Sequence, residues 1–518
     1  MLRVVLAFLG GFASFVSGVS FAAQSPNILI VYADDLGYGD VRVYNPDRGK
    51  IPTPHLDALS REGIRFTDAH SSSAVCSPSR YTLLTGRYHW RSRLQKGIVG
   101  LWGAPVIPSS RLTLGRIAQQ AGYHTACVGK WHLGWEWPIP PELKPYFETG
   151  GYGGEKNRVA SQAHRKAWRR VFRSKLEGGP LSVGFDEYFG VDVPNWPPYC
   201  FIEGERTVGV PTTFADPKLF EKNQANVQGP AMPGWTLEPI LPALGRRAAD
   251  IIDRSARGGR PFFLYLSLTS PHTPLSVNAP WRGASGLNRY ADFVMETDAV
   301  VGEVLSALDD ARITGETLVC FTSDNGCAPY IGVSELEARG HHASGPLRGY
   351  KADVWEGGHR VPFIVRWPGV IEPNSVCHQL VHQADLLATV AEILGRRLPP
   401  DAGEDSFSLL SLLKGERAAI RETAVSCSIR GVPSIRWDSW KWIPQGGSGG
   451  WSKGGDEDAE QLYNLAQDLG EVRNLALERP AQVKKLADRL ERLIVNGRST
   501  PGPRQANDVD VVRYPMSH

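Results

Sequence analysis

The sequence predicts an α/β fold in which a mixed, mostly parallel sheet lies between layers of helices, followed by a smaller antiparallel α+β subdomain. Three observations lead to this prediction. Short apolar runs, each too short for a helix, recur up to residue 367. Segments with the apolar period of a helix alternate with these runs, and the pattern changes after Gly415. Strands that alternate with helices are typical of a sheet covered on both faces.

Five runs rich in Val, Ile, Leu or Phe are expected to be buried parallel strands. They are residues 27–33, 124–129, 262–268, 317–323 and 362–367. Helices are expected at residues 112–120, 290–308 and 383–395. In the second of these, Val294, Val301 and Leu305 fall on one face, and the third ends at Gly395.

The C-terminal segment has a different pattern. An alternating run at 435–443 precedes a glycine-rich turn at 445–450 and a strand or turn at 461–465. A helix is expected from about residue 480 to 495, since Val483, Leu486, Leu490 and Ile494 are in helical register. We therefore divide the chain into residues 1–23, a main domain at 24–415, and a C-terminal subdomain with a tail at 416–518.

Residues 1–23 are predicted to be a signal peptide that is cleaved near Ala22 or Ala23. The alternative is an uncleaved membrane anchor, because Arg3 is the single basic residue before the apolar run. No later stretch approaches the roughly 20 apolar residues that a membrane span needs. The expected protein is thus exported, periplasmic or secreted, without a membrane span.

Overall charge and cysteine content exclude two classes of protein. A net charge of +3 over 518 residues gives no reason to expect a nucleic-acid partner. Seven cysteines are too few, and odd in number, for a disulfide scaffold. One or two disulfides are compatible with the sequence, and Cys76 is the candidate for a cysteine that stays unpaired.

A basic insertion occupies residues 155–178, where Arg158, Arg165, Lys166, Arg169, Arg170, Arg173 and Lys175 lie close together. The favoured interpretation is a solvated helix face. The alternative is a lip over a polyanionic substrate.

Acidic and amide side chains follow two of the predicted strands. Asp34 and Asp35 come directly after strand 27–33, and Asp324 and Asn325 come after strand 317–323. Ligands of open parallel sheets bind beyond the carboxyl ends of the strands, so these groups are expected to converge. Like charges about 4 Å apart cost ~4 kcal/mol at an effective dielectric near 20, and a divalent cation removes that cost. Oxygen ligands suit Ca²⁺ or Mg²⁺, although the same residues are also common turn formers.

Cationic and imidazole side chains follow the other strand ends. Lys130 and His132 come after strand 124–129, His272 follows strand 262–268, and Lys351 lies in a glycine-rich loop that begins at Gly345. Such groups, close to carboxylates, can bind a small tetrahedral anion and move protons around it.

Cys76 stands in the stretch V-C-S-P-S-R at 75–80. Pro78 suits the first turn of a helix and Gly86 suits its end, so Cys76 is expected at a helix N-terminus, where a reactive thiol is physically reasonable. A thiolate is nevertheless a poor partner for a hard cation, and an exported thiol is prone to oxidation. Cys76 therefore makes more sense as the precursor of another group.

The motif Cys-Ser-Pro-Ser-Arg at 76–80, continued by Leu-Leu-Thr-Gly-Arg, resembles the signature of the type I sulfatase family. Further motifs occur in family order: Asp-Asp at 34–35, Gly-Lys-Trp-His at 129–132, Pro-His at 271–272, Asp-Asn-Gly at 324–326, and the glycine-rich segment 345–362. The resemblance implies an alkaline-phosphatase-like fold and a sulfuric ester hydrolase.

The resemblance also implies a set of residue roles. A formylglycine-generating enzyme converts Cys76 to formylglycine, whose hydrate attacks sulfur. Ca²⁺ is held by Asp34, Asp35, Asp324, Asn325 and an oxygen of residue 76, with Asp324 accepting the proton of the nucleophile. Lys130, Lys351 and His272 neutralise the sulfuryl oxygens, and His272 or Lys351 protonates the leaving alcohol. Arg80 holds the oxygens of residue 76, and His132 removes the proton from the second hydroxyl so that sulfate leaves.

The stretch 191–195 departs from the pattern in which some family members place a serine at the sulfate end of the site. Here Asn195 replaces that contact or the contact is lost, and Trp196 and Tyr199 are expected to shape substrate choice. The leading hypothesis is a sulfatase acting on a sulfated carbohydrate. The alternatives are a formylglycine-dependent phosphodiesterase or phosphonate monoester hydrolase, and a catalytically silent glycan-binding homologue.

Overall fold

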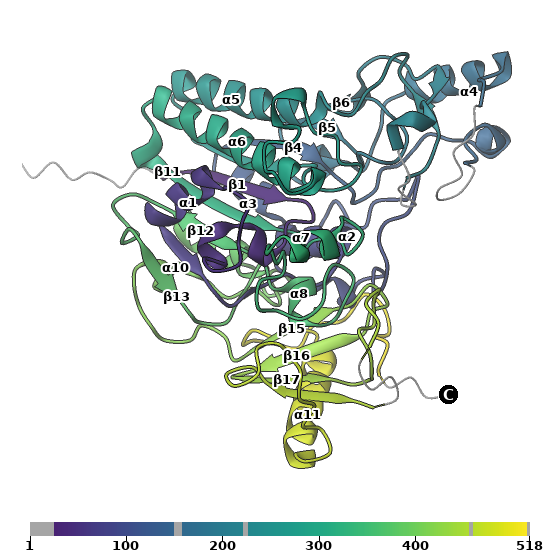
Figure 1. Ribbon diagram of the computed structural model, residues 1–518. Helices are drawn as coiled ribbons and strands as arrows, with labels where there is room; N and C mark the ends of the chain where they lie inside the picture. The colour runs from purple at the N-terminus through teal and green to yellow at the C-terminus, as the bar shows by residue number, and fades with distance from the viewer. Residues whose placement is uncertain (1–24, 150–157, 221–225, 455–458, 515–518) are drawn as a thin grey trace, which may run out of the picture.

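The computed structural model describes residues 25–149, 158–220, 226–454 and 459–514 (Figure 1). Its centre is a ten-stranded sheet in the order β13-β2-β12-β11-β1-β10-β4-β5-β6-β7. These strands are β1 (Asn27–Ala33), β2 (Ile64–Phe66), β4 (His124–Lys130), β5 (Glu187–Val191), β6 (Ile202–Glu203), β7 (Arg206–Thr207), β10 (Phe262–Ser267), β11 (Thr317–Ser323), β12 (Phe363–Arg366) and β13 (Ser375–Cys377). Strands β11, β1, β10, β4 and β5 pair in parallel, so the predicted α/β fold with a mostly parallel sheet is confirmed.

The prediction that the fifth apolar run is a parallel strand is wrong. Strand β12 pairs antiparallel with β11, and β2 in turn pairs antiparallel with β12. An apolar run reveals burial but not direction. The chain stays at the carboxyl edge of the sheet after β11 and enters β12 from that edge, which keeps Lys351 beside the other strand-end residues.

The helices of the main domain cover both faces of this sheet. The described α-helices of this domain are α1 (Pro54–Arg61), α2 (Cys76–Thr85), α3 (Leu114–Gln120), α4 (Gln162–Phe172), α5 (Ile240–Gly258), α6 (Arg289–Asp310), α7 (Val333–Ala338), α8 (Glu356–His359), α9 (Asp385–Ile393) and α10 (Leu410–Leu413). Of these, α4 packs in a separate apolar cluster and not on the sheet. Leu29 and Val31 of β1 pack into the core that contains α1, α5 and α6. Ile28 and Ile30 pack into the core that contains α2, α3 and α9. Alternate residues of one buried strand thus serve two cores, as expected for a sheet between helix layers.

The C-terminal subdomain is a four-stranded antiparallel sheet with one long helix, and it lies below the main sheet in Figure 1. Its elements are β15 (Thr423–Cys427), β16 (Pro433–Trp437), β17 (Trp440–Ile443), β18 (Gln461–Asn464) and α11 (Pro480–Asn496). Leu486 and Leu490 of α11 pack in one cluster with Ile435 and Trp442. The predicted antiparallel subdomain is confirmed, whereas the division at Gly415 stays a prediction.

The run at 435–443 is two strands rather than one continuous element. Asp438 has a φ of 55° and turns the chain between β16 and β17, which pair antiparallel. Asp tolerates this left-handed conformation better than most residues, so Asp438 was the residue from which the turn could have been predicted.

Short paired strands complete the described fold: β3 (Ala69–His70) with β14 (Val381–His382), and β8 (Thr213–Phe214) with β9 (Pro230–Ala231). All seven cysteines are free and buried, so neither of the disulfides that the sequence allowed is present. Within the described ranges, none of the helices combines the length and apolarity that crossing a membrane requires. The predicted signal peptide at 1–23 lies outside the described residues.

The basic insertion contains α4, which is drawn at the upper right of Figure 1. Trp168, Val171 and Phe172 are buried in an apolar cluster, while Arg165, Lys166 and the other described basic side chains of α4 face solvent. A solvated helix face accounts for this arrangement. Residues 155–157 of the insertion lie outside the described ranges.

Candidate active site

The ends of β1 and β11 bring four buried polar side chains together. The Asp35 backbone N–H donates to Oδ1 of Asp324 at 3.0 Å, and Nδ2 of Asn325 donates to Oδ1 of Asp35 at 2.8 Å. Asp34, Asp35, Asp324 and Asn325 are at most 1 % exposed. Parallel pairing places Ala33 opposite Ser323, and this register aligns the residues that follow.

Each of the three carboxylates contacts a buried cation. Nζ of Lys130 lies 2.7 and 2.9 Å from the two oxygens of Asp34, and Nζ of Lys351 lies 2.6 and 2.7 Å from those of Asp35. Nη2 of Arg80 lies 2.8 Å from Asp324 and 3.2 Å from Asp34. Buried charges need such partners, because desolvation of an isolated charge is costly.

The charges in this cluster move the carboxyl pKa values in opposite directions. Burial would raise the pKa of Asp34, but Lys130, His272 and Arg80 hold it well below its usual range. Burial and the neighbouring Asp34 raise the pKa of Asp324 to about 7, with Arg80 opposing them. Opposed shifts in adjacent groups are typical of sites that perform acid–base chemistry.

Cys76 is the first residue of α2, as predicted, and that helix ends at Gly86 with a φ of 62°. Its Sγ lies 3.5 Å from Oδ1 of Asp34 and 3.6 Å from Nζ of Lys351. Burial raises the pKa of the Cys76 thiol to about 12, and Lys130 and Lys351 only partly offset this effect. Desolvation of the buried thiol therefore outweighs the favourable effect of the helix N-terminus on a thiolate.

The close approach of β4 to β10 positions Lys130 and Arg80. Gly129 has a φ of 116°, and a Cβ there would lie 1.7 Å from the carbonyl oxygen of Ser267. The Ser267 hydroxyl donates to the Lys130 carbonyl at 2.7 Å and accepts a hydrogen bond from Arg80. The sequence analysis did not identify Ser267 as a site residue. Its position at the end of the predicted strand 262–268 was the one feature that could have indicated this role.

The two predicted histidines lie in the same region. Nε2 of His272 is 3.6 Å from Asp35, and its Nδ1 faces the Thr273 carbonyl. Burial lowers the pKa of His272 to about 4 despite the opposing charge of Asp35. Asp34, Asp35, Cys76 and His272 each offer a ligand atom within 4.8 Å of the others, so these four could surround one metal ion.

His132 is buried and has a φ of 53°, a conformation that is uncommon for a residue other than glycine. Its Nε2 lies 3.1 Å from the Val99 carbonyl and therefore carries the proton. Within the described part of the chain, its Nδ1 has no hydrogen-bond partner. Burial, together with Lys130 and Arg80, holds the pKa of His132 well below its usual value, so the ring is neutral and has a free lone pair.

A protein-family model described as Sulfatase matches residues 26–163 and 206–396 of this chain. The chain belongs to the sulfatase family. The resemblance inferred from the motifs is thereby confirmed, and the protein is a hydrolase of sulfate esters.

Named relatives agree with this assignment. The N-acetylgalactosamine-6-O-sulfatase of Bacteroides thetaiotaomicron is 31% identical in an alignment of 509 positions that covers 90% of this chain and 93% of that protein. Arylsulfatase A of Homo sapiens is 31% identical over 88% of this chain and 84% of its own length. A solved structure from the glycosaminoglycan metabolism of B. thetaiotaomicron has a TM-score of 0.76 and 28% identity, and covers 91% of this chain and 99% of its own.

The phosphonate monoester hydrolase of Agrobacterium radiobacter shares the fold of this sulfatase. It has a TM-score of 0.54 and 18% identity, and covers 90% of this chain and 95% of its own. At this identity the likeness concerns the fold alone.

The segment that departs from the family pattern borders His132. The Trp196 ring lies 5.5 Å from the His132 ring in an edge-on arrangement, and Asn195 is buried beside it in sequence. Tyr199 is also buried, and its hydroxyl contacts the carbonyls of Asn195 and Val227 at 2.7 Å. These two contacts hold the Tyr199 hydroxyl within this loop.

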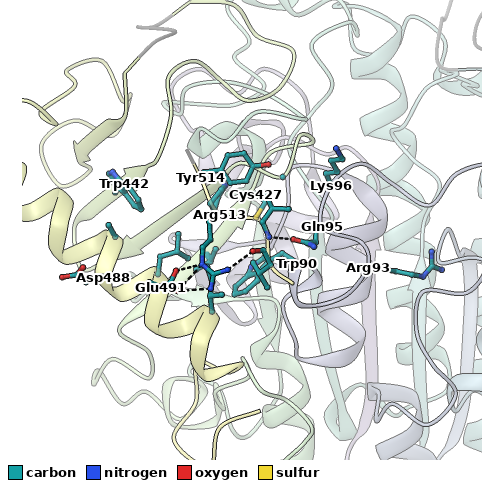
Figure 2. A pocket seen from close by; sticks show the side chains of 18 residues that line it. Trp90, Arg93, Gln95, Lys96, Cys427, Trp442, Asp488, Glu491, Arg513 and Tyr514 are labelled. Atoms are coloured by element: carbon teal, nitrogen blue, oxygen red, sulfur yellow. Dashed lines mark hydrogen bonds and ion pairs between the residues drawn. The ribbon is translucent and has the colours of Figure 1, made fainter. Parts of the chain in front are cut away.

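A cavity of about 510 Å³ lies elsewhere, between α11, the C-terminal tail and the loop at 93–96 (Figure 2). Trp90, Cys427, Trp442 and Tyr514 line it, and Arg513 pairs with Glu491 at its edge. None of the predicted site residues lines this cavity, so it is separate from the strand-end cluster of the sulfatase.

Proposed function

We propose that this sulfatase is an exported enzyme that releases sulfate from a sulfated carbohydrate, using formylglycine made from Cys76 and one bound Ca²⁺. The observation that carries the proposal is the position of Cys76, within 3.6 Å of both a carboxylate and a lysine of the strand-end cluster. The carbohydrate part is supported by N-acetylgalactosamine-6-sulfatases, among them the human and B. thetaiotaomicron proteins, at 32% and 31% identity. Export rests on the predicted signal peptide.

The residues present fit a hard divalent cation. Asp34, Asp35 and Asp324 supply carboxylate oxygens, and Oδ1 of Asn325 is buried without a hydrogen-bond partner among the described residues. An unpartnered buried oxygen is costly unless a ligand satisfies it. We assign these four residues and the residue 76 oxygen to Ca²⁺, which when bound stabilises negative charge as a Lewis acid.

The surroundings of residue 76 also fit formylglycine. A buried thiol that keeps its proton is a poor nucleophile, and sulfur is a poor ligand for a hard cation. Formylglycine, in its hydrated form, supplies an oxygen nucleophile and a second hydroxyl that permits product release. Its formation requires a formylglycine-generating enzyme as a maturation partner.

The remaining residues are assigned to anion binding and proton movement. Lys130, Lys351 and His272 surround the carboxylates and are proposed to bind the sulfuryl oxygens, with His272 or Lys351 beside the leaving alcohol. Arg80 is fixed by two carboxylates and by Ser267, so it can hold the side chain at position 76 in place.

Two groups in the proposal accept protons. Asp324 is assigned to accept the proton of the nucleophile, which is the role that the resemblance to the family implies for it. His132 is assigned to accept the proton that is lost when sulfate is released, because its Nδ1 lone pair is free.

The proposal is tested by sulfate release from defined sulfated mono- and disaccharides, with 4-nitrophenyl sulfate and bis(4-nitrophenyl) phosphate as a matched pair. We expect turnover of at least one sulfated sugar and faster hydrolysis of the sulfate ester than of the phosphate diester. Turnover of the diester alone would favour the phosphodiesterase alternative. Turnover of 4-nitrophenyl sulfate without any sugar would contradict the carbohydrate assignment.

A further inference from the structure

Two exposed aromatic side chains contact each other across the two parts of the molecule. Tyr330 is 45% exposed and Trp451 is 44% exposed, and among the described residues no other aromatic side chain is as exposed. Their ring centroids are 5.9 Å apart and the rings are tilted by 43°. Tyr330 belongs to the main domain, whereas Trp451 lies between β17 and β18. Exposed aromatic surface is unfavourable in water, and paired exposed rings mark binding surfaces.

Tyr330 lies beside the strand-end cluster. It follows Asp324 and Asn325 on the loop that leaves β11, and the Cys327 carbonyl on the same loop accepts a hydrogen bond from the Lys351 N–H at 2.8 Å. The loop that carries Tyr330 is therefore held against the segment that carries Lys351, while the Tyr330 side chain itself is 45% exposed.

Trp451 is held next to the segment that carries Lys351. Its backbone N–H donates to Oδ1 of Asp353 at 2.9 Å, and the Val354 N–H donates to the Ser448 carbonyl at 2.8 Å. A Cβ at Gly450 would lie 2.3 Å from the Ala352 carbonyl oxygen, so these two backbone segments are in close contact. The Lys351 N–H is itself fixed by the Cys327 carbonyl at 2.8 Å.

From this arrangement we infer that Tyr330 and Trp451 form an aromatic platform that packs against the ring of the sugar from which sulfate is removed. The inference rests on the proposed function and names a subsite for it. The C–H groups on one face of a pyranose form a flat apolar surface, which an aromatic ring covers at little cost in side-chain entropy.

Through Trp451, the C-terminal subdomain would contribute to substrate choice. Lys351 and Trp451 are joined through Asp353, so the sugar contact keeps a fixed distance from the anion-binding lysine. Since Trp451 touches only the leaving group, its loss should weaken sugar binding and leave the binding of inorganic sulfate unchanged.

The test compares Trp451→Ala, Tyr330→Ala and Trp451→Phe with the parent enzyme on the sulfated saccharide that the enzyme hydrolyses best. Leu477→Ala is the matched control, because Leu477 is an apolar side chain of the C-terminal subdomain that is 94% exposed. We expect Trp451→Ala to raise KM about 3- to 10-fold, the loss typical of one aromatic contact, with kcat within about twofold. Trp451→Phe should recover most of the loss, and Leu477→Ala should change nothing.

Inhibition by inorganic sulfate separates a lost sugar contact from a damaged site. The inhibition constant should stay the same in Trp451→Ala, since sulfate has no ring to place on the platform. An unchanged KM for the saccharide in Trp451→Ala and Tyr330→Ala would overturn the platform while leaving the proposed function intact. A parallel change in the sulfate inhibition constant would overturn it as well, because the effect would then lie in the anion site. Absence of sulfated-sugar turnover in the parent enzyme would instead contradict the proposed function and, with it, the platform.

Discussion

Glu471 gives the stability of this sulfatase a pH dependence that one substitution should remove. This carboxyl is fully buried where the C-terminal subdomain meets the main domain. Lys441 lies 2.8 Å from it, and the Glu356 backbone N–H donates to it at 2.7 Å. Lys441 also lies 3.0 Å from the Glu356 carboxylate, so one ammonium serves two buried acids. Burial, with Glu356 nearby, raises the pKa of Glu471 from 4.5 to about 7, and Lys441 only partly offsets this rise.

A raised pKa means that the folded state binds the proton more tightly than the unfolded state does. The stabilisation by protonated Glu471 is therefore complete below pH 4.5 and is lost as the pH rises through about 7. At 1.36 kcal/mol per pKa unit, the shift from 4.5 to about 7 corresponds to about 3 kcal/mol in the free energy of unfolding. Glu471→Gln keeps a neutral side chain at every pH and should not show this loss.

The assay is denaturant unfolding of both proteins, followed by tryptophan fluorescence, at a pH near 4.5 and at a pH near 8. Relative to the parent protein, we expect Glu471→Gln to gain about 3 kcal/mol between the two pH values, since titrating groups remote from Glu471 cancel in the comparison. Glu478→Gln is the control, because Glu478 lies on the same segment in an exposed pair with Arg473. Its difference from the parent should change by less than about 1 kcal/mol. An equal difference between Glu471→Gln and the parent at both pH values would refute the reasoning.

Three further predictions concern the site and its support. Asn325→Ala removes the unpartnered amide oxygen and should weaken Ca²⁺ affinity about 10-fold or more, measured by calorimetric titration; unchanged affinity would remove Asn325 from the ligand set. Lys130→Met leaves Asp34 without its closest cation and should lower kcat/KM roughly 10²- to 10³-fold in steady-state assays. A loss of less than about tenfold would exclude a role of Lys130 at the sulfuryl group. Arg91→Ala leaves Asp405 buried without a cation and should cost about 3–5 kcal/mol in denaturant unfolding, with a cost below about 1 kcal/mol contradicting the importance of this ion pair.

The strand-end chemistry could be predicted because it depends on short motifs. A buried apolar run that leads directly into Asp-Asp, Lys or Asp-Asn determines both the strand and the edge at which the polar groups emerge. The register of β1 with β11 then brings Asp34, Asp35, Asp324 and Asn325 together without any further information. The resemblance supplied their roles, which the geometry alone does not assign.

Other features depend on tertiary contacts that the sequence does not reveal. The direction of β12 follows from where the chain re-enters the sheet, and an apolar run carries no such information. Helix α5 was missed although Leu241, Leu244 and Ile251 repeat with helical spacing, because prolines and glycines precede it. The raised pKa of the Cys76 thiol could not be predicted, since it depends on burial in the folded chain and on charges that come from four separate strand ends and loops.

The aromatic pair that is proposed to recognise the substrate also could not be predicted from the sequence. Tyr330 and Trp451 are 121 residues apart and carry no motif, so nothing in the sequence connects them. Their contact arises from the docking of the C-terminal subdomain on the Lys351–Val354 segment, which is long-range information.

The central claim is that residue 76 acts as an aldehyde and not as a thiol, and the mass of one peptide tests it most directly. The peptide containing residue 76 should be measured in active enzyme from its native producer, alongside specific activity across preparations. The account predicts a peptide lighter than the cysteine form by one sulfur and two hydrogens and heavier by one oxygen, with activity proportional to that form. Full activity in enzyme whose residue 76 is entirely unmodified cysteine would contradict it.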